Sequence, residues 1–338
     1  MLYIDETLVN RLVERQRSRR GPAGNPAGPA RYWTASGRPA AGRARPPGPR
    51  GGAHGLDRRG RGAPGTEVPA PRELGAASAR SLLLTVLGEF VLPGGEPVWT
   101  ATFLRALGLL GVEEKAVRQA LARSAGEGWL AGERHGRRTA WRLTPSGERL
   151  LTDGTERIYG FGRPVGAWDG RWLLVLATVP ETSRRLRHLL RTRLAWSGLG
   201  NLAPGVWVSP HPEREPEVRE VLAGIGVADG STLFTGELGD LAEARRVARQ
   251  AWDLEEIGLA YGDFLDAVGA LRPADDPGTF AAHTRLVQEW RRFPFLDPGL
   301  PAALLPDDWS GAQAVALFHE RHDTWRPVAD RQWKALSA

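Results

Sequence analysis

Three long polar side chains recur at helical spacing near residue 115, and their types suit contact with nucleic acid. Lys115, Arg118 and Gln119 share one side of a helix that is expected to follow the turn at Gly111 and to end at Gly126 and Gly128, and Ala122 continues that side. Lysine and arginine reach phosphates, arginine and glutamine pair with base edges, and alanine lets a helix approach closely. The opposite side is small and mostly apolar, comprising Val117, Ala120, Leu121 and Ser124. The pattern predicts a DNA-recognition helix, with Arg118 and Gln119 at base edges, Lys115 at phosphates and Arg123 as a further contact.

A basic hairpin follows this helix. Two short strands are expected at residues 129–131 and 141–143, and the segment between them carries Arg134, Arg137 and Arg138 around a turn glycine. A basic loop beside a basic helix suits one groove and its flanking phosphates, so these three arginines are expected to contact phosphates.

The residues before the recognition helix predict its scaffold. One helix is expected over residues 81–90 with Ser78 as its N-cap, and a second runs from Trp99 to Leu110. A short turn through Gly108 and Gly111 joins the second helix to the recognition helix. Two helices with a tight turn and a following hairpin predict a winged helix-turn-helix over residues 77–144. The alternative is a three-helix protein-interaction module with a solvated hairpin.

The charge of the chain is unevenly divided. The net charge of +6 splits into +8 over residues 1–76, +3 over 77–144 and −5 over 145–338. Only the expected DNA-binding module and the tail before it therefore have the basic character of a nucleic-acid binder. The chain has no cysteine, no apolar run near the ~20 residues of a membrane span and no signal-peptide pattern at Met1. We expect a cytoplasmic protein without a membrane partner.

Residues 1–76 read as a disordered basic tail. They are rich in Gly, Pro, Ala and Arg, and they lack the apolar periodicity needed to offset chain entropy. A short helix is conceivable over residues 6–19. The tail is either a basic arm that adds weak affinity for DNA or an upstream stretch included by a mis-assigned start codon in a GC-rich gene.

The middle of the chain predicts a second, mixed module. Thr144 and Pro145 begin an expected helix to about residue 158, and residues 145–170 form a linker helix and connection. Strands and helices then alternate in the order β-α-β-β-α-β over residues 171–239, which predicts a ferredoxin-like dimerisation domain. Expected strands cover 172–179, 198–202, 205–209 and 231–237, and expected helices cover 183–196 and 215–225. The arginines of the first of these helices form a solvated face or, alternatively, meet the phosphates of a nucleotide-bearing ligand.

The remaining residues, 240–338, predict a helical domain. Helical patterns cover 241–258, 259–271, 279–292 and 312 to about 333, with tryptophans and phenylalanines at core spacing. Arg291 and Arg292 beside the aromatic residues of the segment 289–295 could form a rim that captures an anion. The fold class is thus α+β and multidomain.

Motifs that carry catalysis are missing from the sequence. His319 and His322 are separated by two residues, whereas a helical zinc motif needs i, i+4 spacing. There is no Walker sequence and no Gly-x-Ser-x-Gly. We therefore expect no metal site, no cofactor and no enzymatic activity.

Several segments in a fixed order resemble the PaaX family of bacterial repressors, named for control of phenylacetate catabolism. They are residues 80–90, 111–123, 128–130, 168–172, 202–207, 251–254 and 289–295, and the resemblance covers about 78–336. It implies a winged helix domain, a ferredoxin-like domain similar to CRISPR-associated adaptation nucleases and a helical C-terminal domain. It also implies a dimeric repressor that binds an inverted-repeat operator and is released by an aryl acyl-CoA such as phenylacetyl-CoA. Tyr261, Arg291 and Arg292 are the expected effector contacts.

The resemblance to nucleases supplies a competing function. Those nucleases carry a metal-binding aspartate at the end of their first strand. Here the corresponding residues are Thr178, Val179 and Pro180, and Glu181 lies beyond the proline. The sequence therefore favours a regulator over a metal-dependent nuclease. A third possibility is a protein-binding adaptor with a degenerate winged helix, against which the basic hairpin speaks.

Overall fold

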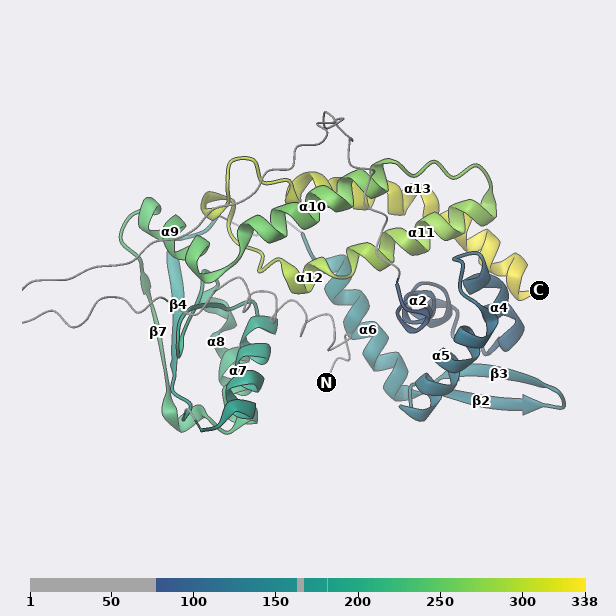
Figure 1. Cartoon of the computed structure of the whole chain (residues 1–338), viewed down its shortest axis with the longest axis horizontal. Coiled ribbons are helices and arrows are strands. Elements are labelled where there is room, and N and C mark those ends of the chain that lie inside the picture. The colour runs from purple at the N-terminus through teal and green to yellow at the C-terminus, as the bar shows by residue number, and fades with distance from the viewer. Residues whose placement is uncertain (1–76, 163–166, 181) are drawn as a thin grey trace, which may run out of the picture.

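The computed structural model describes residues 77–162, 167–180 and 182–338. The expectations for residues 1–76, and the position of Glu181, lie outside the described residues. The chain combines helices and two sheets, and its C-terminal region is helical. Long helices bridge two ends of the molecule: a four-stranded sheet with α7 and α8 lies at one end, and α2, α4, α5 and a hairpin lie at the other (Figure 1). Among the described helices, none is both long and apolar enough to cross a membrane.

The first helical segment begins where the sequence predicts and then changes its pitch. Ser78 caps α2 (Ala79–Val86) by accepting a hydrogen bond from the Ser81 amide at 3.1 Å. The helix continues as a π-helical turn, η1 (Leu87–Val91), in which the Leu92 amide bonds to the Leu87 carbonyl. A last turn, α3 (Leu92–Gly94), ends at Gly95 with a φ of 65°. The π-turn contains the buried Glu89.

Trp99 departs from the sequence prediction. It was expected to start the second helix. Instead Val98 and Trp99 form a short strand, β1 (Val98–Trp99), that pairs with the hairpin strand β3. The Trp99 side chain is 36% exposed and its ring lies 5.5 Å from that of His135. The helix itself, α4 (Thr100–Gly108), starts one residue later and leads through a turn into α5 (Glu114–Gly126).

The hairpin is longer than predicted. Strands β2 (Leu130–His135) and β3 (Arg138–Leu143) pair in continuous antiparallel register from Leu130 opposite Leu143 to His135 opposite Arg138. Arg134 and Arg138 therefore lie in the strands, and only Gly136 and Arg137 form the tip. Gly136 adopts a φ of 61°, which the tight turn requires.

Helix α6 (Pro145–Gly160) fixes the hairpin to the rest of the chain. Thr144 caps it by accepting from the Gly147 amide at 3.1 Å, and Pro145 occupies the first turn, as the sequence predicts. The helix packs so close to the hairpin base that a Cβ at Gly147 would lie 2.2 Å from the Trp129 carbonyl oxygen.

The second sheet has strand order β5-β6-β4-β7, and all its pairs are antiparallel. Leu173, Val175 and Ala177 of β4 face α7 and α8 in a shared core. Leu189 of α7 is 37% exposed, whereas Leu190 and Leu194 of the same helix are buried. The bounds are β4 (Arg171–Ala177), α7 (Arg184–Trp196), β5 (Gly200–Ala203), β6 (Val206–Ser209), η2 (Pro212–Arg214), α8 (Glu215–Ile225), η3 (Ala228–Gly230) and β7 (Ser231–Glu237).

The C-terminal helices break at a different place from the one predicted. The expected boundary at Gly258 lies inside a helix, and the break falls at Trp252 and Asp253. Asp253 sets this boundary, because its side chain accepts a hydrogen bond from the Glu256 amide and caps the start of a new helix. The bounds are α9 (Leu241–Ala251), α10 (Leu254–Gly269), α11 (Asp276–Trp290), α12 (Phe293–Leu296), η4 (Ala302–Leu304) and α13 (Gly311–Ser337).

The two ends of the chain share a hydrophobic core. Phe280 of α11 and Trp333 of α13 are buried among the apolar residues of α2, α4 and α5. The Trp333 ring stacks on Phe90 with centroids 5.3 Å apart and lies 6.1 Å from Phe103. The N-terminal helices are therefore packed against the C-terminal helices, and the chain does not separate into modules joined only by linkers.

Candidate functional site

Helix α5 buries its apolar side and exposes its polar side. Val117, Ala120, Leu121 and Ser124 are buried, with Val117 and Leu121 at 0% exposure. The predicted contact residues Lys115, Arg118, Gln119 and Arg123 are all exposed. Lys115, Arg118, Gln119 and Ala122 line a shallow open depression together with Glu114.

Glu114, the acidic residue in this depression, forms an ion pair with Arg118. Arg118 donates to Glu114 at 2.7 Å, one helical turn away, and both side chains are more than half exposed. Such an exposed i, i+4 pair contributes only ~0.3–0.5 kcal/mol. Arg118 can therefore leave Glu114 for a stronger bidentate partner at low cost.

The hairpin adds a second set of exposed cations. Arg134, Arg137 and Arg138 are exposed, and β2 and β3 project from the body near α5 (Figure 1). In contrast, Arg142 on the same hairpin is paired with Glu133 at 2.6 Å.

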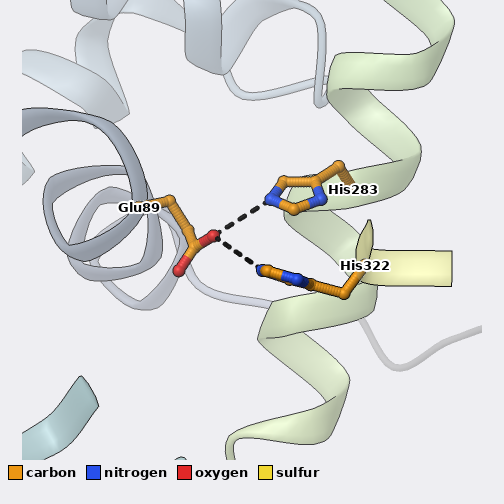
Figure 2. A group of neighbouring side chains, drawn as sticks. All are labelled: Glu89, His283 and His322. Carbon is orange, nitrogen blue, oxygen red and sulfur yellow. Dashed lines mark hydrogen bonds and ion pairs between the residues drawn. The ribbon is translucent and has the colours of Figure 1, made fainter. Parts of the chain in front are cut away.

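A buried polar network lies behind these elements and was not found by sequence reasoning. The Glu89 carboxylate accepts from the Tyr159 hydroxyl at 2.6 Å, from His283 Nε2 at 3.0 Å and from Arg326 Nη1 at 3.0 Å. His322 Nε2 lies 3.8 Å from Glu89 Oε2 (Figure 2). These residues come from η1, α6, α11 and α13. The sequence gives no signal for the network, because it joins residues up to 237 positions apart.

The charge state of this network follows from its burial and its partners. Burial by itself would raise the pKa of Glu89, but the facing imidazoles of His283 and His322 and the Tyr159 hydroxyl lower that pKa well below its usual range. Burial lowers the pKa of His283, and the Glu89 carboxylate opposes this only in part. Glu89 is thus an ionised carboxylate beside a neutral imidazole at pH 7.

A wide cleft of about 3730 Å³ is lined by residues of the four-stranded sheet, of α7 and of the C-terminal helices. Two of the three predicted effector contacts line it. Tyr261 is 1% exposed, donates to Asp297 at 2.6 Å and stacks on Phe293 with centroids 4.3 Å apart. Arg292 lies near Glu289, with 3.8 Å between the charged atoms. Arg291 donates instead to the Ser81 carbonyl and the Thr85 hydroxyl of α2, at 3.2 and 3.1 Å.

Two further arginines in the cleft were missed by sequence reasoning. Arg157 of α6 donates to the Trp196 carbonyl at 2.8 Å and lies 4.3 Å from the Phe295 ring centroid. Arg214 donates to the neighbouring Ser197 carbonyl at 2.8 Å. Burial lowers the pKa of both guanidinium groups, the nearby Glu217 carboxylate raises the pKa of both, and repulsion from Arg214 lowers that of Arg157. Because arginine keeps its charge in proteins, the pair remains cationic and partly desolvated, and Glu217 balances part of that charge.

Comparison with known proteins identifies the family. Family models match the chain at residues 78–147 (PaaX-like protein), 165–248 (PaaX protein central Cas2-like domain) and 252–335 (PaaX-like protein C-terminal domain). The transcriptional repressor PaaX of Escherichia coli (strain K12) is 33% identical over 264 residues, which cover 75% of this chain and 82% of that protein.

The chain belongs to the PaaX family. The resemblance drawn from the sequence is therefore confirmed. The chain is also similar to the solved structure of an uncharacterized protein from Mycobacterium tuberculosis, which is 29% identical, with a TM-score of 0.52. The match covers 75% of this chain and 98% of that one.

Proposed function

We propose that this PaaX family member is a sequence-specific DNA-binding transcriptional repressor, active in the cytoplasm. The observation that carries the proposal is the outward position of Lys115, Arg118 and Gln119 on α5, whose opposite face is buried. The E. coli relative bears the name of a repressor and not that of an enzyme.

In this proposal, the elements that recognise DNA form a winged helix-turn-helix over residues 77–144. In it α4 and α5 are the helix-turn-helix, and β2 and β3 are the wing. Arg118 and Gln119 would contact base edges, each worth ~1–3 kcal/mol of discrimination if bidentate. Lys115, Arg123, Arg134, Arg137 and Arg138 would contact phosphates on either side of that groove.

The middle sheet is our candidate for the dimer interface. Its element order, β4-α7-β5-β6-α8-β7, and its strand order support a ferredoxin-like fold over residues 171–239. Strand β7 is an edge strand, and its Phe234 is 53% exposed opposite Leu174 of β4. Leu176 is 37% exposed on that same face. A second copy of the chain covering this face would set two α5 helices on an inverted repeat.

The effector is proposed to bind in the cleft. An aryl acyl-CoA has an apolar end and a phosphate-bearing end, and the cleft offers Tyr261 for the first and Arg157, Arg214 and Arg292 for the second. Arg291 contacts α2, so in this proposal it links the cleft to the DNA-binding elements. Helix α6 makes a second link, since Arg157 lines the cleft while Gly147 packs under the hairpin. To release DNA, the effector would have to bind the arrangement that cannot bind DNA more tightly than the one that can, by about 1–3 kcal/mol.

The test is a binding titration with the upstream DNA of this gene, followed by a panel of CoA thioesters. Wild-type protein should bind that DNA, and a variant with Lys115, Arg118 and Gln119 replaced by alanine should lose sequence preference. Equal binding by the two proteins would refute the proposal. Arg157→Ala and Arg214→Ala should bind DNA normally but resist release. If no thioester releases wild-type protein, the effector proposal fails and the DNA-binding proposal stands.

The nuclease alternative has little support from the described residues. Strand β4 ends at Ala177 and is followed by Thr178, Val179 and Pro180, none of which can ligate a metal through a carboxylate. A cleavage assay with Mg²⁺ or Mn²⁺ separates the two functions.

A further inference from the structure

We propose that Glu89, His283 and His322 form a binding site for one divalent transition metal ion of the zinc class, which ties η1 to α11 and α13. Among the described residues they are the group of three ligand-type side chains whose donor atoms all lie within 4.8 Å of one another. The two imidazoles approach the same carboxylate oxygen from adjacent helices (Figure 2).

The distances suit a tetrahedral ion. His283 Nε2 lies 3.0 Å and His322 Nε2 lies 3.8 Å from Glu89 Oε2. Zinc bonds to nitrogen and carboxylate oxygen are about 2.0–2.2 Å, so tetrahedral ligand atoms lie about 3.3 Å apart. The observed separations bracket that value, and small side-chain rotations would bring the three atoms onto one ion. Two histidines and one carboxylate are also a ligand set that zinc commonly uses.

Two imidazole nitrogens at this place, His283 Nδ1 and His322 Nε2, are buried without a hydrogen-bond partner among the described residues, and one of them faces Glu89. In the described part of the chain, His322 Nε2 is buried and makes no hydrogen bond, and it faces Glu89 from beyond hydrogen-bond distance. A buried polar atom without a partner is costly, and coordination would satisfy it. The His322 side chain is 15% exposed, whereas His283 is fully buried. A water molecule entering on the side of His322 would supply the fourth ligand of the proposed ion.

The surroundings hold the carboxylate ligand in place. Glu89 sits in the π-helical turn, and such turns are rare and frequently mark functional sites. The Tyr159 hydroxyl fixes Oε1, which leaves Oε2 facing the imidazoles. Hydrogen bonds of this kind orient metal ligands and tune their affinity.

Arg326 places a positive charge beside the proposed ion. Its Nη1 donates to the same Oε2 at 3.0 Å, and its Nη2 donates to the Glu89 backbone carbonyl at 2.8 Å. Asp330 accepts from Arg326 Nε at 2.9 Å and balances that charge. A carboxylate oxygen has more than one lone pair, so Oε2 can accept from Arg326 and bind an ion together.

The experiment uses the full-length chain and zinc chloride, with metal content as its readout. Protein stripped with EDTA is incubated with zinc, desalted and analysed by mass spectrometry for zinc per chain. Wild-type protein should retain about one zinc per chain, as expected for a single site. His319→Gln is the matched control, because His319 lies on the same helix one turn away and outside the cluster; it should retain the same amount. His322→Gln and Glu89→Gln should retain at least about tenfold less, since each removes one of three protein ligands.

Cobalt(II) provides a second readout, and its wild-type result does not depend on the stability of any variant. Stripped wild-type protein with cobalt(II) should develop the intense visible absorption of tetrahedral coordination, and His322→Gln should not. No zinc and no such absorption in the wild type would overturn the proposal. Equal retention by wild type and a folded His322→Gln would overturn it too. Neither readout involves DNA, so the proposal stands or falls independently of the repressor function.

Discussion

Replacing Arg137 and Arg138 together by alanine should weaken binding to every DNA sequence and flatten its salt dependence. Both side chains are exposed on the hairpin, so their removal costs little stability. Each phosphate neutralised contributes about 0.9 to the slope of log affinity against log salt. Losing two contacts lowers the slope by about 1.8 per protomer and about 3.6 per dimer.

The size of the effect follows from that slope. When salt is raised from about 50 to about 200 mM, the ratio of wild-type to variant affinity should fall. The fall is about 12-fold for a slope change of about 1.8 (one protomer) and about 150-fold for a change of about 3.6 (a dimer). Fluorescence anisotropy with labelled operator and with unrelated DNA at four salt concentrations measures both slopes.

The matched control is Arg184→Ala with Arg185→Ala, an adjacent and exposed pair at the start of α7. It removes the same charge at a distance from the hairpin. It also tests whether the arginine-rich α7 binds nucleic acid. An unchanged slope in the hairpin variant, or an equal fall in the control, would refute the assignment of the hairpin arginines.

Three other perturbations test separate parts of the structure. Arg118→Ala and Gln119→Ala should each reduce the preference for operator over unrelated DNA by ~1–3 kcal/mol, measured by competition binding; a uniform loss on both DNAs would contradict base contact. Trp333→Ala should lower the free energy of unfolding by ~3–5 kcal/mol in urea titrations, far more than Trp99→Ala, because only Trp333 is buried. Burial raises the pKa of the Glu289 carboxyl above its ordinary value, and Arg292 opposes this only in part. When the pKa of a carboxyl is higher in the folded than in the unfolded state, the group destabilises the fold at pH values above the folded-state pKa. It has no such effect at pH values below the unfolded-state pKa. Glu289→Gln should therefore be more stable than wild type at pH 7, with no difference near pH 4, and a gap independent of pH would contradict this.

Local signals in the sequence predicted most element boundaries. Ser78 and the Thr144–Pro145 pair start helices as expected, because capping chemistry acts over a few residues. Helix α8 and strand β7 have the predicted bounds. The exposed face of α5 was also predictable, since the helical period alone separates Lys115 and Arg118 from the buried positions.

Predictions failed where contacts between distant residues decide the outcome. Trp99 looks like a helix-core residue, yet pairing with β3 draws it into a strand. The error at Gly258 was local instead, because the Asp253 cap starts the helix earlier and glycine is tolerated inside it. The network around Glu89 brings together four elements whose pairing no local pattern encodes, so His283 and His322 were not linked from the sequence.

Helix α13 is long enough to connect the cleft with the N-terminal helices. Its 27 residues span about 40 Å at 1.5 Å per residue. Val315 near its first turns lines the cleft, while the Leu336 carbonyl near its end accepts from Arg105 of α4. The C-terminus emerges beside α4 (Figure 1). A purification tag fused there would sit next to the elements proposed to bind DNA, so binding measurements should use protein from which such a tag has been cleaved.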